Sequence, residues 1–219
     1  MNRREAEYYR KEENNQVKCL LCPHACNISE TDNGICGVRR NDNGVLYSEN
    51  YARISSIGVD PIEKKPLYHF FPGQKILSIG TTGCNFSCSF CQNWRISQEK
   101  PELKEMKPEE IIELAKKKNA IGIAYTYSEP SVWFEYVKDT ARLAAEEDLK
   151  NVIVSNGFIN QEPLKELLPY IDAANIDLKS MKNKFYHKYC NGQKEPVIKN
   201  IKLMYGNLHV EITTLLITG

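Results

Sequence analysis

The stretch ILSIGTTGCNFSCSFC, residues 76–91, places three cysteines shortly after a short apolar run. Residues 76–80 have the length and the apolar composition of a buried strand. Gly83 and Asn85 favour a loop after that strand, so the thiols that follow can curl inward around one compact centre. These thiols have the spacing C-x3-C-x2-C and belong to Cys84, Cys88 and Cys91.

Three thiolates at this spacing suit a [4Fe–4S] cluster in which one iron has no protein ligand. That open iron can bind the amino and carboxylate groups of S-adenosylmethionine (SAM), and an electron passed through the cluster can break the sulfonium carbon–sulfur bond. The product is a 5′-deoxyadenosyl radical, which abstracts hydrogen from a substrate. The alternative is a zinc site completed by a distant histidine such as His69, although zinc motifs usually pair their cysteines as C-x2-C on two loops.

The composition indicates where the protein works. Lys and Arg number 29 against 28 Asp and Glu, so the net charge of +1 offers no general field for nucleic acid or an anionic membrane. No apolar run approaches the roughly 20 residues that span a bilayer, and residues 1–5 lack the apolar core of a signal peptide. We therefore expect a cytoplasmic protein that binds neither nucleic acid nor membranes. In a reducing cytosol, two tight cysteine clusters indicate metal ligands, and only Cys190, interpreted as an ordinary thiol, stands apart.

The chain divides into two regions of different pattern. We expect residues 1–74 to form a Cys-rich metal-binding module with a connecting arm, and residues 75–219 to form a larger α/β domain. In the first region the patterns predict a polar helix-like lead, then a hairpin, then an arm without regular structure because of its prolines. These elements fall at residues 3–13, at residues 45–47 paired with 51–57, and at residues 58–73.

The larger region alternates apolar runs with amphipathic helices, which predicts a parallel sheet with right-handed crossovers. The strands are expected at 76–80, 121–127, 151–155, 173–178 and 209–217, and the helices at 108–118, 131–147, 161–168 and 195–205. Periodicity does not separate an open sheet from a barrel. Polar residues collect after successive strands, however, and this favours a barrel. The chain ends at residue 219 with the fifth strand, so we expect a partial barrel truncated there.

Three strand ends carry candidate site residues. Glu129 follows the second strand and has two readings, a ligand-binding carboxylate or an N-cap neighbour of the helix that begins near Ser131. Ser155 and Asn156 end the third strand. At the fourth, two charged residues lie two positions apart and thus on one face of the strand, where they form either a site or a structural ion pair. They are Asp177 and Lys179.

The second cysteine cluster lies near the N-terminus, in residues 19–36. Four thiolates and one imidazole within this short stretch suit a closed tetrahedral site, and a module this small needs such a centre to fold. Structural zinc is favoured over a second Fe–S cluster, which could relay electrons. The expected ligands are Cys19, Cys22, Cys26 and Cys36.

Several motifs together carry a family resemblance over nearly the whole chain. They are CLLCPHAC (19–26), GICGVR (34–39), DPIEKKPLYHF (60–70), the cluster motif through QNW (92–94) and YTYSEP (125–130). The chain resembles the radical SAM enzymes of the AmmeMemoRadiSam system, which are related to pyruvate formate-lyase activating enzyme. Three features depart from the pattern: Tyr127 and Ser128 replace two glycines of a Gly-Gly-Glu-Pro element, LITG (216–219) replaces Ile-Pro-Gly, and members of the group continue past residue 219.

The resemblance implies a fold, cofactors and a reaction. The fold is a partial (β/α)6 barrel, and the cofactors are a [4Fe–4S] cluster and SAM, with zinc as a further candidate. It assigns the contacts with SAM to Phe90, Glu129, Ser155, Asn156, Asp177 and Lys179. In glycyl-radical activating enzymes the last two also help to seat the target peptide, so Asp177 and Lys179 are the expected catalytic residues.

We therefore expect an oxidoreductase that acts on a protein or peptide by glycyl hydrogen abstraction, with an external electron donor. One alternative is a radical SAM enzyme for a small molecule or another protein modification. The other is a zinc-binding interaction module without catalysis.

Overall fold

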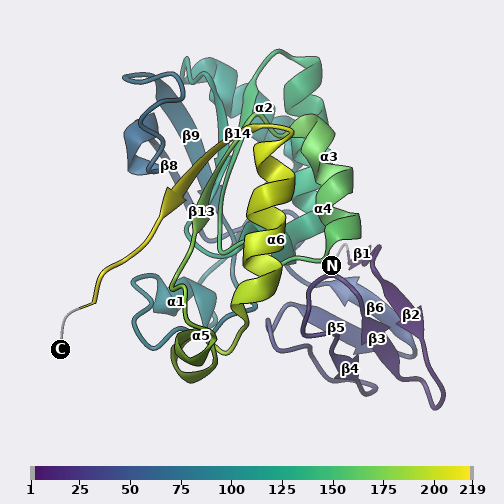
Figure 1. Ribbon diagram of the computed structural model, residues 1–219. Helices are drawn as coiled ribbons and strands as arrows, with labels where there is room; N and C mark the ends of the chain where they lie inside the picture. Colours follow the sequence, from purple (N-terminus) through teal and green to yellow (C-terminus); the bar gives the residue numbers. More distant parts are fainter. Residues whose placement is uncertain (1–2, 218–219) are drawn as a thin grey trace.

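The computed structural model describes residues 3–217, and a six-stranded sheet forms its centre (Figure 1). The strand order is β14-β13-β12-β11-β9-β8, in which β8 is antiparallel to β9 and all other neighbours are parallel. The parallel strands are joined by helical crossovers, which such pairing requires. The strands are β8 (Ser56–Pro61), β9 (Lys75–Gly80), β11 (Gly122–Tyr125), β12 (Lys150–Ser155), β13 (Ala173–Asp177) and β14 (His209–Thr213).

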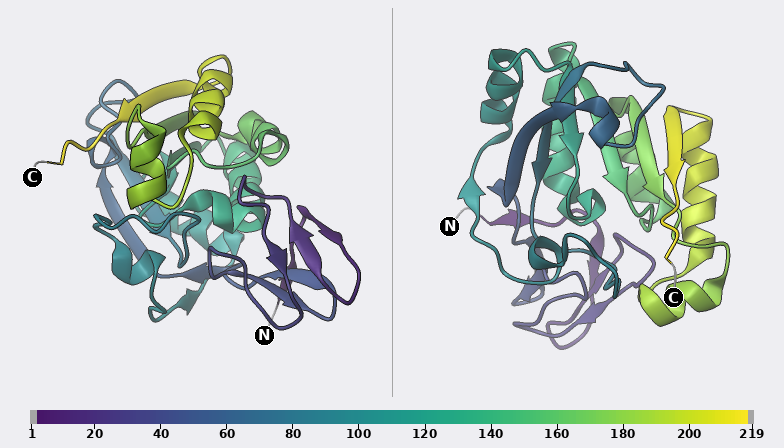
Figure 2. Two further views of the ribbon diagram at one scale, coloured as in Figure 1. Left: turned by 60° about the horizontal axis from the view of Figure 1, so that its bottom comes forward. Right: turned by 90° about the vertical axis from the view of Figure 1, so that its left-hand side faces the viewer.

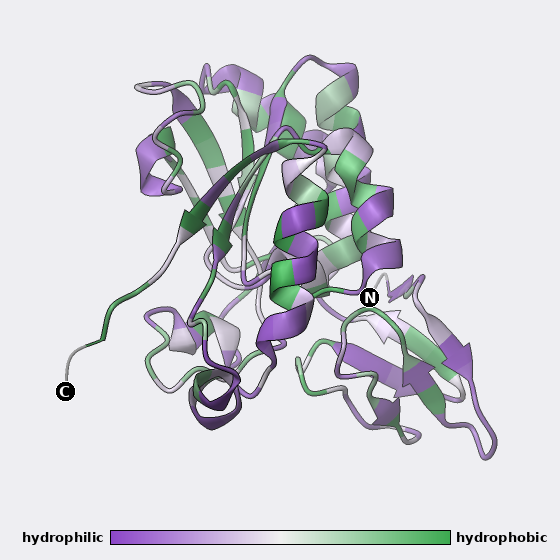
Figure 3. Ribbon diagram, viewed as in Figure 1, coloured by the Kyte–Doolittle hydropathy of each residue, from purple (hydrophilic) through white to green (hydrophobic). Residues whose placement is uncertain are grey.

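Four helices cover one face of this sheet, while two short ones lie near the carboxyl ends of its strands (Figure 1). The covering helices are α2 (Pro108–Lys117), α3 (Phe134–Glu146), α4 (Gln161–Leu167) and α6 (Lys194–Tyr205); the short ones are α1 (Trp94–Ser97) and α5 (Asn183–Tyr189). Three 3-10 turns complete the set: η1 (Ile62–Lys64), η2 (Pro130–Trp133) and η3 (Leu168–Tyr170). Figure 3 shows these helices striped between hydrophobic and hydrophilic residues, as a one-sided packing requires. The expected α/β fold with a partial barrel is confirmed.

The two faces of the sheet bury different residues because side chains alternate along a strand. Leu77, Ile123 and Ile153 belong to the main core with the helices. Their neighbours in the chain face the other side, where Ile62 and Leu67 from the segment before β9 pack against them. These neighbours are Ile76, Ala124 and Val152, and Ala173 of β13 joins them. The segment that precedes β9 thus fills the concave face, apart from the space left at the carboxyl ends of the strands.

A β-rich module from the N-terminal part lies beyond the carboxyl ends of the sheet strands (Figure 2). It contains two three-stranded sheets, β1-β6-β5 and β2-β3-β4, while β7 pairs with β10 in a two-stranded sheet. The strands are β1 (Arg4–Glu5), β2 (Tyr9–Lys11), β3 (Val17–Cys19), β4 (Asn27–Ile28), β5 (Arg39–Asp42), β6 (Val45–Ser48), β7 (Arg53–Ile54) and β10 (Lys104–Glu105).

Three expectations for this part of the chain were wrong. Residues 3–13 form strands instead of a helix, because pairing of β1 with β6 and of β2 with β3 overrides a weak helix propensity. The Asn43-Gly44 turn joins β6 to β5 instead of preceding a hairpin with residues 51–57. Residues 58–61 of the expected irregular arm belong to β8, and residues 62–64 form η1.

The division of the chain after residue 74 stays a prediction. The six-stranded sheet draws β8 from the residues before that point, and one hydrophobic core contains residues from both parts. Over residues 3–217, no helix has the length and apolar character needed to cross a membrane.

Candidate active site

A cavity of about 300 Å³ lies at the carboxyl ends of the parallel strands. The loop or terminal residues after every parallel strand contribute to its wall, which confirms the expectation that these polar residues meet. They include Cys84, Cys88 and Cys91 after β9, Glu129 after β11, Ser155 and Asn156 at β12, Asp177 and Lys179 at β13, and Thr213 at β14. A second cavity, of about 420 Å³, lies elsewhere, and its wall carries charges of both signs from surface residues such as Arg142 and Asp139.

The loop after β9 depends on one glycine and on the end of α5. Gly83 has a φ of +91°, and a Cβ there would lie 2.7 Å from the carbonyl oxygen of Cys36 in the N-terminal module. Only glycine fits both the conformation and this close approach. Further on, the backbone N–H groups of Ser87 and Ser89 donate to carbonyl oxygens at the end of α5, at 3.0 and 2.9 Å. The loop is thereby held between the module and α5.

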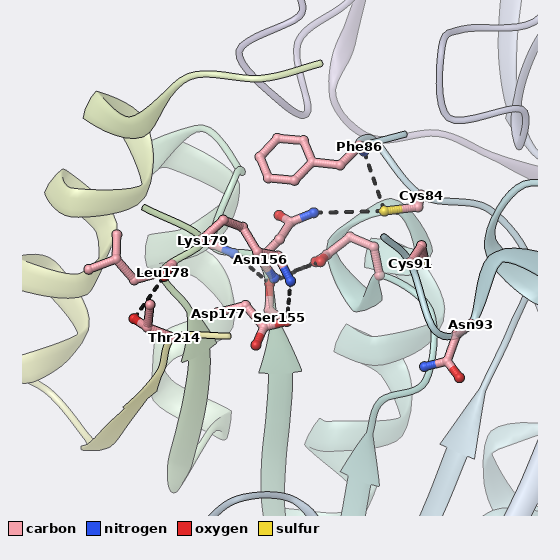
Figure 4. A network of polar contacts seen from close by, with 12 residues as sticks. Cys84, Phe86, Cys91, Asn93, Ser155, Asn156, Asp177, Leu178, Lys179 and Thr214 are labelled. Atoms are coloured by element: carbon pink, nitrogen blue, oxygen red, sulfur yellow. Dashed lines mark hydrogen bonds and ion pairs between the residues drawn. The ribbon is translucent and has the colours of Figure 1, made fainter. Parts of the chain in front are cut away.

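Cys84 is the most enclosed of the three thiols. Its sulfur accepts hydrogen bonds from the Phe86 N–H at 3.3 Å and from Asn156 Nδ2 at 3.8 Å (Figure 4). Burial, and then the nearby Glu129 carboxylate, raise the pKa of Cys84 well above its usual value. A positively charged partner, such as a metal centre, is therefore needed before this sulfur ionises.

Neither cysteine group of the described chain is arranged as the ligands of a single metal ion would be. Within the described chain, no three Cys, His, Asp or Glu side chains are grouped as ligands of one ion would be. A lone zinc draws its sulfur ligands to about 2.3 Å, whereas each cysteine of a cubane binds a different iron. His69, the histidine of the zinc alternative, is 82% exposed at its side chain, and its Nδ1 lies 3.5 Å from Glu211. The arrangement is one of separate thiols around an open space.

Cys190 lies beside this loop, which the sequence did not indicate. It caps α5, is fully buried, and shares a hydrogen bond with Cys88. This hydrogen bond lowers the pKa of Cys88 and raises that of Cys190. The two cysteines are far apart in the sequence, and only the packing of α5 against the loop brings them together.

Glu129 joins the ends of two strands. Its side chain is almost fully buried, and Oε1 accepts from the Ser131 N–H at 3.0 Å and from the Ser155 hydroxyl at 2.7 Å. Oε2 accepts from the Asn156 N–H at 2.8 Å. Burial raises the pKa of Glu129 in spite of these donors. The N-cap reading is confirmed, since the carboxylate caps η2, while contacts of Glu129, Ser155 and Asn156 with SAM stay a prediction.

Asp177 and Lys179 form the expected ion pair, with Nζ 2.7 Å from Oδ2 (Figure 4). Burial alone would lower the pKa of Lys179, but the adjacent carboxylate outweighs it and the pKa is raised. Lys179 is thus a cation at the cavity wall, and the catalytic role of the pair stays a prediction. Phe90 also lines the cavity and packs against Phe185, with the ring centroids 5.7 Å apart. Its contact with SAM likewise stays a prediction.

The four N-terminal cysteines lie within electrostatic range of one another. Their sulfurs are surrounded by backbone: N–H groups of Leu21, His24 and Val38 donate to the cysteine two positions before each of them. Burial raises the pKa of Cys19 to about 11 and that of Cys22 to about 12. All eight cysteines fall in the described residues, and none forms a disulfide. The group of Cys19, Cys22, Cys26 and Cys36 is called the N-terminal thiol cluster below.

The N-terminal thiol cluster is joined to the loop after β9. The ring Nε2 of His24, in the CLLCPHAC motif, lies 2.7 Å from the carbonyl oxygen of Asn85 and donates to it in the tautomer protonated there. The same ring packs edge-on against Phe158, with centroids 5.1 Å apart. The module therefore forms the wall behind the three thiols of the cavity.

Comparison with known proteins agrees with this arrangement. The family model described as "Radical SAM superfamily" matches residues 78–219. An uncharacterized protein of Methanocaldococcus jannaschii, MJ0808, is 46% identical over 218 residues, which are 98% of this chain and 65% of that protein. The chain thus spans about two thirds of the length of this relative.

Among solved structures, Streptococcus suis SuiB bound to the precursor peptide SuiA is similar with a TM-score of 0.50 at 16% identity. The match covers 69% of this chain and 34% of SuiB, and it supports the fold alone. QueE from Escherichia coli matches with a TM-score of 0.45 at 10% identity, over 76% of this chain and 95% of QueE.

Proposed function

Because this chain belongs to the radical SAM superfamily, we propose that it cleaves SAM reductively at a [4Fe–4S] cluster held by Cys84, Cys88 and Cys91. The observation that carries the proposal is the meeting of these thiols in one cavity with the ends of every parallel strand. Family membership implies the cluster and SAM as cofactors.

The residues fit such a cluster in two respects. Three separate thiols leave one iron free of protein ligands, and the N–H donors at Cys84 are of the kind that stabilises a thiolate bound to iron. When bound, the cluster and SAM would supply a 5′-deoxyadenosyl radical together with methionine, using one electron from an external donor. The cavity is also polar at the strand ends, where the amino and carboxylate groups of SAM need partners.

The chain's own residues then have distinct tasks. Glu129 is fully engaged with Ser131, Ser155 and Asn156, so we propose that it acts by holding those strand ends in place. Lys179 carries a positive charge at the cavity wall and is paired with Asp177. We propose that this pair binds the carboxylate of SAM or the backbone of the target, and that Phe90 covers the adenine.

The substrate proposed is a protein or peptide from which a glycyl hydrogen is removed. Support comes from the resemblance of the Asp177-Leu178-Lys179 segment to glycyl-radical activating enzymes and from the motifs shared with the AmmeMemoRadiSam group. One electron from the donor would cleave SAM to methionine and the 5′-deoxyadenosyl radical. This radical would take a hydrogen atom from the substrate to give 5′-deoxyadenosine, leaving the unpaired electron on the substrate. A small-molecule substrate is the competing outcome of the test below.

The reaction is tested by anaerobic reconstitution with iron and sulfide, followed by SAM and dithionite. We expect methionine and 5′-deoxyadenosine from the unchanged protein, and neither from Cys88→Ala. Lys117→Ala, on the exposed side of α2, is the matched control and should leave product formation unchanged. Equal product from Cys88→Ala and the unchanged protein would reject the proposed site.

The substrate class is tested with deuterium. Extracts of deuterium-labelled cells are separated into macromolecular and small-molecule fractions, and each is added to the reaction. Deuterium in 5′-deoxyadenosine from the macromolecular fraction alone is expected, because abstraction transfers the substrate hydrogen. Deuterium from the small-molecule fraction alone would favour the competing reading. An electron paramagnetic resonance doublet of a glycyl radical would identify the abstracted hydrogen.

We further propose that the N-terminal thiol cluster binds a metal and that this metal is zinc. Four cysteines at short spacing, with backbone donors at three of them, support the proposal. The described chain does not group these side chains as ligands of one ion, so the proposal requires that they close around the metal as it binds. A second Fe–S cluster is the rival occupant. The metal content of variants that retain only one thiol group decides between them, as described in the Discussion.

A further inference from the structure

The backbone at Tyr127 has a strained conformation. Its φ is +70°, in the region that favours glycine, and the Ser128 N–H donates to the Thr126 carbonyl oxygen at 3.0 Å across it. This is a γ-turn of the rare form with positive φ. Thr126, Tyr127 and Ser128 all line the cavity. A residue other than glycine holds such a turn only where its surroundings force it to.

The side chain of Tyr127 is fitted into the sheet beside this turn. Its Cβ and ring edge lie over Gly80 at the end of β9, where an added Cβ would be 3.0 Å from Tyr127 and 2.6 Å from the Thr126 carbonyl oxygen. The ring then reaches β8, where the hydroxyl donates to Asp60 Oδ2 at 3.2 Å. The tyrosine therefore spans from β11 across β9 to β8.

Lys65 holds the ring and its acceptor together. Its Nζ lies 4.7 Å from the centroid of the Tyr127 ring and 3.1 Å from Asp60 Oδ2. The Lys65 side chain is only 3% exposed, which is rare for a lysine and requires partners of this kind. The neighbouring Lys64 also contacts Asp60, on Oδ1, but is 67% exposed. Asp60, the buried Lys65 and the ring of Tyr127 therefore form one anchor.

The turn at Tyr127 is also held by the loop that carries Cys84, Cys88 and Cys91. Asn93, two residues after Cys91, donates from Nδ2 to the Tyr127 carbonyl oxygen at 2.7 Å. The backbone of Tyr127 thus contacts the cysteine loop, while its side chain contacts the segment of residues 60–65. Asp60 and Lys65 are not among the residues that line the cavity, and they contact its wall through Tyr127.

We propose that Asp60 and Lys65 are positioning residues that fix the strained turn at Tyr127 and thereby aim the backbone of residues 126–128 at the amino-acid part of SAM. The inference rests on the proposed function, because it assigns that backbone to SAM. A glycine in this place would hold the turn by itself. Tyr127 needs the anchor, and the anchor connects the segment that fills the concave face to the ligand cavity.

The test is a double-mutant cycle on Lys65 and Tyr127, with the SAM dissociation constant of the reconstituted protein measured by anaerobic calorimetry. Lys65→Met should weaken SAM binding about tenfold, because the turn relaxes. Tyr127→Gly removes the ring through which Lys65 acts, so in that background Lys65→Met should change the constant less than about twofold. An equal loss of SAM affinity on Lys65→Met in the unchanged and the Tyr127→Gly backgrounds would mean that Lys65 only stabilises the fold, and it would overturn the proposal. No loss of SAM affinity in either background would also overturn it.

Controls separate this outcome from other failures. Lys64→Met removes an exposed lysine from the same Asp60 and should leave SAM affinity unchanged. Iron content and thermal unfolding of each variant show whether the cluster and fold persist. If Lys65→Met does not fold, Tyr127→Phe removes only the hydroxyl bond to Asp60, and a loss of SAM affinity is then required of it. An unchanged, cluster-loaded protein that fails to bind SAM would instead reject the proposed function.

Discussion

The two cysteine groups of the molecule differ in what surrounds their sulfurs. Cys84, Cys88 and Cys91 line a cavity shared with five strand ends, so a ligand can reach them. The N-terminal thiol cluster lies in a small β-module, where backbone N–H groups donate to three of its four sulfurs. Both groups are rich in cysteine at short spacing, yet one is built beside open space and the other is enclosed by its own chain.

The difference shows that cysteine count and spacing do not by themselves separate thiols that line a cavity from thiols held by neighbouring backbone. What separates them is the element that follows each group. After β9 a parallel sheet supplies further strand ends, whereas after Cys36 the chain enters the β5–β6 hairpin. The two groups still touch, through His24 and Asn85 and through Cys36 and Gly83.

The largest effect should come from removing each thiol group in turn. Replacing Cys84, Cys88 and Cys91 by Ala should remove the cluster iron but leave the fold and the N-terminal metal. Elemental analysis of this variant then shows whether the N-terminal metal is zinc or iron. Replacing the N-terminal thiol cluster by Ala should prevent stable folding of the module, since a structural zinc site contributes on the order of 10 kcal/mol. Metal content is measured by elemental analysis and stability by thermal unfolding. An unchanged unfolding midpoint in the variant without the N-terminal thiol cluster would contradict a structural role for that cluster.

A smaller effect should come from the ion pair between the N-terminal module and α3. Arg39 and Glu135 are 2% and 0% exposed, with Nη1 2.6 Å from Oε1. Burial alone would raise the pKa of Glu135, but Arg39 outweighs it and the pKa is lowered. Arg39→Met leaves the Glu135 carboxylate buried without its cationic partner. This variant should lower the free energy of unfolding by about 3–5 kcal/mol in urea titrations.

Lys116→Met is the matched control for that measurement, because its ion pair with Glu147 is exposed and should contribute less than about 1 kcal/mol. Equal losses in the two variants would mean that the module is not held by Arg39. The two cysteine groups would then differ only in the surroundings of their thiols.

The smallest effect should come from the bridge between the two groups. His24→Phe keeps the ring contact with Phe158 but removes the hydrogen bond to Asn85, which should cost about 1 kcal/mol of unfolding free energy. Because Asn85 adjoins Cys84, the electron paramagnetic resonance spectrum of the reduced cluster should shift as well. His187→Phe, on the exposed side of α5, should change neither. An unaltered spectrum in His24→Phe would show that the two groups are independent.

The sequence predicted elements whose signal is local. The apolar runs placed β9, β11, β12 and β13 within a few residues, and Pro108 with its apolar stripe placed the start of α2. The same patterns failed for residues 3–13, because isolated polar strands carry no periodic signal and are stabilised only by pairing with β6 and β3. β8 was missed for a related reason, since Gly58 and Pro61 indicate an irregular arm until β9 is present to pair with it.

By itself, the sequence determined the chemistry: the three thiols at C-x3-C-x2-C, the polar residues after successive strands, and the ion pair of Asp177 and Lys179 were all readable because spacing along a loop or strand fixes which side chains share a face. Only the tertiary structure decided which distant groups meet. Cys190 beside Cys88, Glu129 between Ser155 and Asn156, and Lys65 over the Tyr127 ring join residues 15 or more positions apart in the chain or on separate elements. Such contacts leave no pattern in the sequence, because they form only when burial of the core brings separate elements together.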